Sequence, residues 1–169
     1  MATPDRIALV GFMGSGKSTV GGLLAAAVGY RLVDVDDLIV EHAGMSIVEI
    51  FRRRGEDSFR ELESRLLLGL GRRRGLVIAT GGGAPMLPPN HEFLRTRCRT
   101  FYLEISAAEV RRRIGSDRGR PKLAATPGGV EELLAARRPW YETIGDTVPA
   151  EGRTPAQVVA TIRTLLSGR

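Results

Sequence analysis

A glycine-rich segment near the start of the chain constrains the fold more than any other feature. Residues 11–19 read GFMGSGKST and fit the pattern G-x-x-x-x-G-K-[ST], which forms a loop between a buried strand and a helix. The flanking sequence agrees, since residues 7–10 (IALV) are a short apolar run and residues 20–28 are rich in alanine and leucine. Gly29 is then suited to end this helix as its C-terminal cap.

The residue types in this segment are those that bind a polyphosphate. Gly11, Gly14 and Gly16 allow tight bends and leave no Cβ between the backbone and a ligand. Successive N–H groups can then surround an anion at the positive end of a helix. Lys17 would place a cation beside the phosphates, and the Ser18 hydroxyl is a hard oxygen ligand for Mg²⁺. The alternative is an ordinary glycine turn, which the complete pattern disfavours.

The composition is that of a globular protein. The chain has 169 residues, of which 43% are hydrophobic and 26% are charged. No apolar run approaches the roughly 18 residues of a membrane helix, and the start, MATPDR, lacks a signal-peptide pattern, so we predict a cytoplasmic protein. Cys98 is the only cysteine, which excludes an internal disulfide and a cysteine-based metal site. We interpret it as a buried small hydrophobe.

The net charge of +6 comes almost wholly from arginine, because Lys17 and Lys122 are the only lysines. Arginine binds carboxylates and phosphates with a planar fork of donors, so this charge suits a small anionic substrate as well as nucleic acid. We interpret most of the arginine runs, residues 52–54, 72–74 and 111–113, as solvated surface. The few aromatic residues do not alternate with these arginines, which disfavours a surface that stacks on nucleic-acid bases.

Strand and helix signals alternate along the chain, which predicts an α/β fold with a parallel sheet. The expected strands are residues 6–10, 31–34, 76–79, 99–105 and 147–149. The expected helices are residues 20–28, 46–51, 56–70, 106–114, 130–144 and 154–166, with Gly55 as a break and Pro139 inside the fifth. Residues 46–49, 106–109 and 154–157 fit capping boxes. We see no interdomain linker, so residues 1–169 are expected to form one domain.

Two polar segments follow predicted strands and should lie on the same edge of the sheet as the phosphate loop. Asp34 and Asp36 come at the end of the second strand, and residues 80–85, TGGGAP, follow the third. Aspartates before a helix can also be capping residues, and three glycines can be a flexible turn. The position beside the phosphate loop favours ligand binding for both segments.

The segment of residues 115–129 is the best loop candidate in the chain. It is rich in glycine and proline, and its length suggests a lid rather than a simple connection. Arg118 and Arg120 lie within it.

Taken together, these segments resemble the shikimate kinase family. The resemblance rests on GFMGSGKST, the aspartates of LVDVDD, the helical GEDSFRELE, the TGGG loop, RGRP and ARRPWY, and it covers essentially the whole chain. It implies a P-loop kinase fold with a five-stranded parallel sheet in the order 2-3-1-4-5, like that of nucleoside monophosphate kinases. It also implies transfer of the γ-phosphate of ATP to the 3-hydroxyl of shikimate, on the route to chorismate and aromatic amino acids.

The resemblance further implies a role for individual residues. The implied catalytic residues are Lys17, Asp36 and Arg120. The implied ATP-binding residues are Gly14, Ser15, Gly16, Lys17, Ser18, Thr19, Arg120 and Arg153. The implied shikimate-binding residues are Asp36, Arg60, Gly81, Gly82, Gly83 and Arg137, most of them in an acceptor region of residues 34–62 or in the TGGG loop. The implied cofactor is Mg²⁺, held by Ser18 and Asp34.

The clamp for the carboxylate of shikimate leaves alternatives open. Arg60 could instead be a solvated residue paired with Glu56 or Glu63, and without the family pattern nothing selects it over Arg65.

The second arginine of the clamp and the lid also leave alternatives open. Arg138 follows Arg137, so the clamp could be displaced by one residue; the resemblance favours Arg137, because its spacing to Pro139 and Tyr141 matches the family. Lys122 stands where the family usually has leucine, and we expect it to face water.

Three rival activities are compatible with a phosphate loop. They are a kinase for another small acceptor such as gluconate or a nucleoside monophosphate, an ATPase that binds nucleic acid, and a nucleotide sensor without activity. The triple glycine and the clamp arginines disfavour the first, and the intact Lys17, Ser18 and aspartates disfavour the last. We therefore expect shikimate and ATP as partners of a monomer, without nucleic acid or a membrane.

Overall fold

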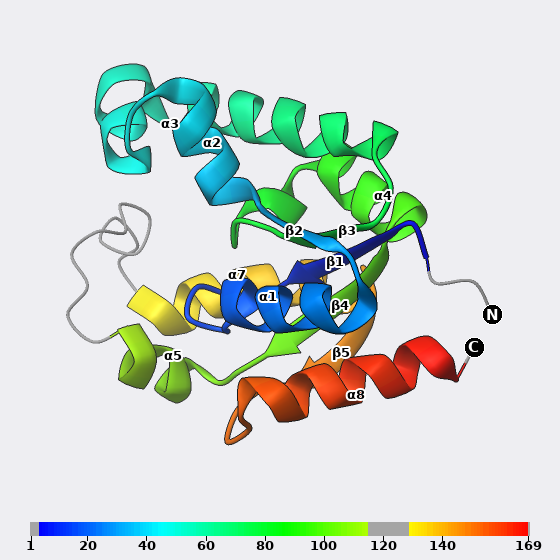
Figure 1. Ribbon diagram of the computed structural model, residues 1–169. Coiled ribbons are helices and arrows are strands. Elements are labelled where there is room, and N and C mark those ends of the chain that lie inside the picture. The colour runs from blue at the N-terminus through cyan, green and yellow to red at the C-terminus, as the bar shows by residue number, and fades with distance from the viewer. Residues whose placement is uncertain (1–3, 115–128, 169) are drawn as a thin grey trace.

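The computed structural model describes residues 4–114 and 129–168 and contains a five-stranded sheet in which neighbouring strands are parallel (Figure 1). The strand order is β2-β3-β1-β4-β5, as predicted. The strands are β1 (Arg6–Val10), β2 (Arg31–Asp34), β3 (Leu76–Ala79), β4 (Arg99–Glu104) and β5 (Asp146–Pro149). The phosphate loop follows β1, the middle strand.

Helices cover both faces of this sheet. The helices are α1 (Lys17–Val28), α2 (Val35–Ala43), α3 (Ile47–Gly69), α4 (Pro88–Arg97), α5 (Ala107–Ile114), α7 (Gly129–Glu142) and α8 (Pro155–Ser167), with 3-10 turns η1 (Leu70–Arg72) and η2 (Ala84–Met86). α1 and α8 pack together on one face, and α4 and α7 lie on the other (Figure 1). α2 and α3 pack against each other beside the β2 edge.

The alternation of side chains along the strands explains these layers. β1 is buried along its whole length, as the middle strand of a covered parallel sheet should be. Leu9 faces α1, where Gly21 lets the helix come close: a Cβ on Gly21 would lie 3.5 Å from Leu9 Cδ1. Leu9 pairs with Phe101, so the next residue of β4, Tyr102, points to the opposite face. There it stacks on Tyr141 of α7, with ring centroids 5.0 Å apart.

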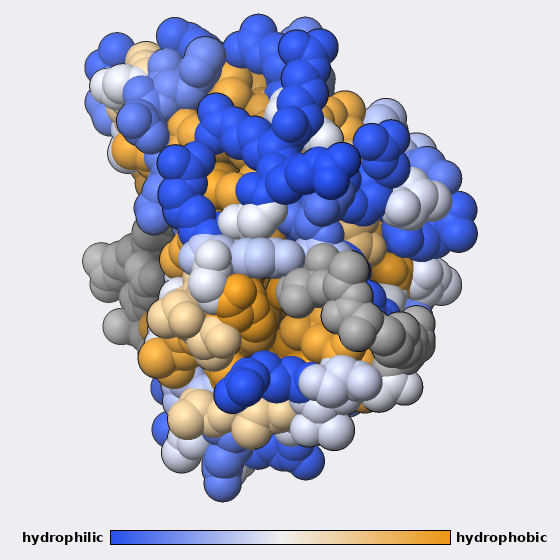
Figure 2. Space-filling view, turned by 45° about the vertical axis from the view of Figure 1, so that its right-hand side comes forward, coloured by the Kyte–Doolittle hydropathy of each residue, from blue (hydrophilic) through white to orange (hydrophobic). Residues whose placement is uncertain are grey.

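Most of the surface seen in Figure 2 is polar. Hydrophilic residues cover much of the upper part of this view, and hydrophobic residues show between them and in a larger area below the centre. Among the described residues, the large hydrophobic residues that are exposed are Leu23, Val40, Val48, Leu68 and Trp140; they come from four helices, and the two that share α3, Val48 and Leu68, lie near its opposite ends. None of the described helices is both long enough and apolar enough to span a membrane.

The helix ends mostly follow the predicted signals. Gly29 ends α1 with φ 72°, in the left-handed region. The capping boxes of Ser46 with Glu49 and of Thr154 with Gln157 open α3 and α8, each with both reciprocal hydrogen bonds. These signals are local, which is why the sequence alone is enough to read them.

The predicted capping box before α5 forms only in half. Ser106 Oγ accepts a hydrogen bond from the Glu109 N–H at 3.2 Å, but the Ser106 N–H donates to Glu151 Oε2 instead. The Glu109 side chain turns to Arg112 and Arg113, because charge-assisted bonds to two guanidinium groups are stronger than one bond to a backbone N–H. Those two arginines lower the pKa of Glu109 to about 2.

Two helices were not predicted, and two predicted helices are joined into one. α3 runs through the expected break, and Gly55 forms a kink there with φ 78° and ψ 175°. α2 starts directly after Asp34, and α4 starts with Pro88 and Pro89, which are tolerated only in a first turn. α2 thus begins at the aspartates that the sequence left open as capping residues, and α4 begins in a segment with two prolines.

Most of the predicted lid lies outside the described residues. This applies to residues 115–128 and therefore to Arg118, Arg120 and Lys122. Gly129, which was predicted as the last residue of the lid, begins α7.

Gly145→Ala should lower the free energy of unfolding by about 3 kcal/mol, the upper end for an overpacked site. A Cβ at Gly145 would lie 2.1 Å from the Thr100 carbonyl oxygen, which belongs to the backbone of β4. Gly69→Ala is the matched control, because nothing lies within 4 Å of the Cβ that it adds. It should leave stability unchanged or raise it by up to about 1 kcal/mol. Urea unfolding followed by circular dichroism measures both, and equal midpoints for Gly145→Ala and the parent would contradict this packing.

Candidate active site

A hollow of ≈ 250 Å³ opens at the carboxyl ends of β1, β2 and β3. Its lining residues are Met13, Gly14, Gly16, Lys17, Ser18, Thr19, Asp34, Asp36, Thr80 and Gly82. The carboxyl ends of neighbouring parallel strands share one edge of the sheet, where open α/β folds form ligand sites. The phosphate loop, the aspartate pair and the triple glycine therefore meet in one place.

The phosphate loop has the backbone conformation that its glycines predict. Gly11, Gly14 and Gly16 have φ 144°, 77° and 90°, values that residues with a side chain rarely adopt. α1 starts without a side-chain cap, as expected where a bound anion accepts the first N–H groups of a helix. Lys17 Nζ donates to the carbonyl oxygens of Gly11 at 2.9 Å and Phe12 at 2.8 Å. The loop therefore holds this cation against its own backbone.

Asp34 makes two contacts, one through each carboxylate oxygen. Oδ1 accepts a hydrogen bond from the Asp36 N–H at 3.0 Å and caps α2, whereas Oδ2 accepts one from Ser18 Oγ at 2.5 Å. The capping alternative is therefore correct for Asp34, and it coexists with a contact to the phosphate loop. Asp36 lies in the first turn of α2 and lines the same hollow.

The donor set beside the phosphate loop fits Mg²⁺. Ser18 Oγ and the Asp34 carboxylate are hard oxygen ligands, and Mg²⁺ is usually bound by one or two carboxylates together with water and substrate phosphates. Within residues 4–114 and 129–168 there is no group of three or more His, Cys, Asp or Glu side chains that could hold a metal ion. A magnesium ion here would therefore depend on the phosphates of its nucleotide.

The loop of residues 81–83 needs glycine for space rather than for backbone conformation. None of its residues has a positive φ. A Cβ at Gly81 would lie 2.5 Å from Glu63 Oε1. A Cβ at Gly83 would lie 2.5 Å from Arg60 Nη2. The missing side chains thus let charged groups from α3 lie directly on the loop.

Arg60 forms the ion pairs that the sequence left as an alternative, and it also reaches the triple glycine. Its Nη1 lies 2.5 Å from Glu63 Oε2, and its Nε lies 3.5 Å from Glu56 Oε1. The contact with Gly83 distinguishes it from Arg65, which is exposed. The ion pairs and a place at the loop are therefore compatible.

Glu63 is a buried carboxyl that the sequence analysis did not assign to the site. Its side chain is 0% exposed, and Oε1 has no hydrogen-bond partner in the described part of the chain. Burial raises the pKa of Glu63; the Arg60 guanidinium opposes this shift, and the Asp36 carboxylate adds to it. In sequence, Glu63 reads as a surface partner of Arg60, because its burial depends on the distant loop that covers it.

α7 turns Arg137 inward and Arg138 outward. Arg137 is 7% exposed, its Cζ lies 5.5 Å from the centre of the Phe12 ring, and its Nη1 lies 3.3 Å from the position of a Cβ on Gly82. Arg138 is exposed and lies 3.6 Å from Glu104. The inward position therefore belongs to the residue that the family resemblance favours.

Arg113 belongs to an arginine run that was expected to be solvated, but it contacts the phosphate loop. Its Nη1 donates to the Gly14 carbonyl at 3.1 Å and its Nη2 to the Ala150 carbonyl at 3.2 Å, so it joins the phosphate loop to the segment after β5. A run of three arginines does not indicate which one contacts the phosphate loop. Arg153 is exposed and donates to Thr161 Oγ1 at 3.3 Å, and its predicted place at the adenine stays a prediction.

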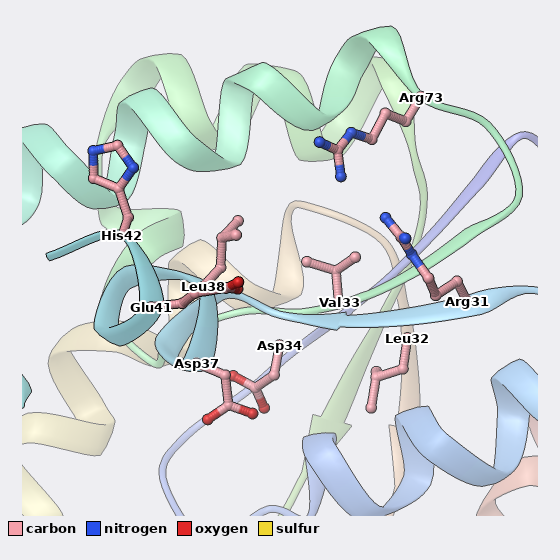
Figure 3. A pocket seen from close by; sticks show the side chains of 9 residues that line it. All are labelled: Arg31, Leu32, Val33, Asp34, Asp37, Leu38, Glu41, His42 and Arg73. Carbon is pink, nitrogen blue, oxygen red and sulfur yellow. The ribbon is translucent and has the colours of Figure 1, made fainter. Parts of the chain in front are cut away.

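A larger hollow of ≈ 680 Å³ lies along the edge strand β2 and shares Asp34 with the candidate site (Figure 3). Arg31 and Arg73 lie at one end of it, and Glu41 and His42 at the other. These four side chains are exposed, and the hollow contains none of the glycine-rich backbone of the candidate site. It therefore reads as solvated surface.

Comparisons with known proteins agree with this geometry. The family model described as shikimate kinase matches residues 13–167. A shikimate kinase of Geobacter sulfurreducens is 44% identical over 163 residues, which cover 95% of this chain and 90% of that protein. The structure of shikimate kinase from Acinetobacter baumannii in complex with shikimate matches with a TM-score of 0.87 and 34% identity, covering 99% of this chain and 96% of that chain. A gluconokinase from Sinorhizobium meliloti, with a TM-score of 0.63, 19% identity and coverage of 99% and 94%, shares the fold alone.

Glu63→Gln should change how stability depends on pH. A carboxyl whose pKa is raised by folding takes up a proton when the chain folds, so its contribution to stability falls as pH rises between the unfolded value of 4.5 and the raised folded value. The variant lacks this titration, so its free energy of unfolding relative to the parent should increase as pH rises through that interval.

Urea unfolding at a series of pH values measures this difference. Glu61→Gln, at an exposed position of the same helix, controls for the loss of one negative charge. A difference between Glu63→Gln and the parent that stays constant with pH, or that runs in the opposite direction, would contradict a raised pKa at Glu63.

Proposed function

Because the chain belongs to the shikimate kinase family, we propose that it transfers the γ-phosphate of ATP to the 3-hydroxyl of shikimate. The products are shikimate 3-phosphate and ADP. The enzyme is then a phosphotransferase with an alcohol group as acceptor, in the pathway to chorismate and aromatic amino acids. Its oligomeric state and its location in the cell stay predictions.

The observation that carries the proposal is the meeting of two guanidinium groups on one glycine loop. Arg60 of α3 lies on Gly83, and Arg137 of α7 lies on Gly82. A guanidinium group can make paired N–H···O bonds in a plane, so two of them fix the orientation of a carboxylate as well as its charge. A small acceptor that carries a carboxylate, as shikimate does, suits this arrangement.

The phosphate loop and Asp34 supply the nucleotide side of the proposed site. The N–H groups of the loop and the Lys17 cation would bind the polyphosphate, with Ser15 and Thr19 as further loop contacts. Ser18 and Asp34 would hold Mg²⁺, which supplies neutralisation of phosphate charge when bound. The pairing of Ser18 Oγ with Asp34 Oδ2 supports this assignment.

In the proposed reaction the acceptor oxygen forms a bond to the γ-phosphorus while the bond from that phosphorus to the βγ-bridging oxygen breaks. ADP leaves with the bonding electrons, and the hydroxyl proton goes to a base. Asp36 is the proposed base, because its carboxylate lines the hollow next to the phosphate loop. Arg120 is proposed to add positive charge from the lid, on the family resemblance alone.

A panel of acceptors tests the proposal against its rivals. ADP release should rise strongly with shikimate and should stay at the background level with gluconate, nucleoside monophosphates or single-stranded DNA, and it should require Mg²⁺. Lys17→Ala is the control for contaminating kinases and should lower the rate by about 10²–10³. Phosphorus NMR of the product identifies the hydroxyl that is phosphorylated. A rate that another acceptor raises more than shikimate does would overturn the proposal.

Arg137→Lys should weaken shikimate binding by about 1.5–3 kcal/mol, because lysine keeps the charge but loses the fork. ATP binding should barely change. Arg138→Lys is the matched control, since Arg138 is exposed and points away from the loop. Calorimetric titration of each variant with shikimate and with ATP decides between them. If Arg138→Lys is the damaging change and Arg137→Lys is silent, the clamp is misplaced by one residue.

A further inference from the structure

Tyr141 makes a second contact between α7 and the triple glycine. It is fully buried, and its hydroxyl donates to the Gly82 carbonyl oxygen at 2.5 Å. Arg137 lies one helical turn earlier and faces the same glycine, with Nη1 3.3 Å from the position of a Cβ on Gly82. α7 therefore meets one residue of the loop twice, once through a guanidinium and once through a phenol.

The hydrogen bond to Gly82 fixes the direction of a whole peptide unit. The peptide bond is planar and trans, so the Gly82 carbonyl and the Gly83 N–H point in opposite directions and rotate together. Residues without a Cβ have a soft backbone, and three of them in a row make the orientation of this unit hard to hold by local forces. An external partner for the Gly82 carbonyl removes that freedom.

A carbonyl oxygen can only accept a hydrogen bond, so its partner must be a donor, and the phenol hydroxyl of Tyr141 is one. Burial raises the pKa of Tyr141, so the hydroxyl keeps its proton and stays a donor across the ordinary pH range. The ring is held from the other side by its stacking on Tyr102, with centroids 5.0 Å apart. Both ends of the side chain are thus fixed, one by packing and one by the hydrogen bond.

We propose that Tyr141 is a positioning residue for the acceptor: by holding the Gly82 carbonyl, it sets the direction of the Gly83 N–H and the distance of Arg137 from the glycine loop. This inference rests on the proposed function, because it concerns the same carboxylate clamp. In this role Tyr141 does not touch the reacting atoms. It acts through Gly82 and Arg137, so its loss should affect acceptor binding more than turnover at saturation.

Tyr102 offers a matched comparison within the same ring pair. It is also buried, and its hydroxyl lies toward Arg138 but has no hydrogen-bond partner in the described residues. Tyr141→Phe and Tyr102→Phe each remove one buried hydroxyl and keep both rings. Only the first removes a hydrogen bond to the loop.

The experiment measures KM for shikimate and for ATP, kcat and thermal stability for the parent and both variants. Tyr141→Phe should raise the KM and the dissociation constant for shikimate by about two- to tenfold, the range expected for one neutral hydrogen bond. Its KM for ATP and its kcat should stay within about twofold of the parent. Tyr102→Phe should leave the KM for shikimate unchanged. Tyr141→4-aminophenylalanine, which restores a donor at the end of the ring, should restore shikimate binding.

Two outcomes would overturn the inference. One is a KM for shikimate that is the same in Tyr141→Phe and Tyr102→Phe. The other is a parallel rise in both KM values that follows the loss of thermal stability, which would indicate a merely structural role. If Tyr141→Phe does not fold, Tyr141→4-aminophenylalanine and Tyr141→4-methylphenylalanine, which differ in the donor alone, carry the same prediction.

Two further measurements separate this inference from the proposed function. Hydrogen exchange of the peptide that contains residues 80–84 should be faster in Tyr141→Phe than in Tyr102→Phe, whatever the acceptor is. A double-mutant cycle with Arg137→Lys should be non-additive for shikimate binding, since both residues act through Gly82. If the parent does not phosphorylate shikimate, the proposed function fails. If the parent is active and the exchange rates are equal, the positioning role alone fails.

Discussion

The contact between two glycine loops at the carboxyl edge of the sheet is the constraint on which the rest of the site depends. β1 and β3 are paired neighbours whose ends align, with Leu9 opposite Ala79, so the loops that follow them start side by side. A Cβ on Gly82 would lie 3.5 Å from the Gly11 carbonyl oxygen and 3.5 Å from the Met13 nitrogen. Backbone therefore packs on backbone where the triple glycine meets the phosphate loop. The strand pairing sets the separation of these two loops, and catalysis of phosphoryl transfer by positioning depends on such a fixed separation.

Charged groups gather behind this contact although their burial opposes stability. Glu63 and Arg137 are among the few charged side chains buried in the described residues, and Arg60 is largely covered. A buried ion pair contributes little net stability, because desolvation cancels most of the Coulomb attraction. The pairing of Arg60 with Glu63 instead limits the rotamers of a side chain that must keep one orientation. Burial of these charges lowers local stability, and their pairing gives Arg60 a defined orientation, as is common at functional sites.

The fold and the phosphate loop could be predicted from the sequence because their signals are local. Glycine spacing, short apolar runs and capping boxes each need only a few neighbouring residues, and they located all five strands. The helices α2 and α4 were missed because α2 follows β2 without a connecting loop and α4 begins with two prolines. The burial of Glu63 and the contact of Arg113 with the Gly14 carbonyl could not be predicted, since each depends on a loop far away in the sequence. The choice of Arg137 over Arg138 came from family spacing and not from physical reasoning about the chain.

The way in which Lys17 is held has a consequence for covalent chemistry. Its ammonium donates to two backbone carbonyls, which hold the nitrogen against the loop and limit the directions from which an acylating reagent can reach it. The sequence contains only one other lysine, Lys122, so amine-directed labels have very few targets on this chain. The labelling rate at Lys17, read by mass spectrometry, then reports how accessible its nitrogen is within the loop. A nucleotide that engages the ammonium would protect it, which turns an ordinary acylating reagent into a selective footprint of the phosphate-binding loop.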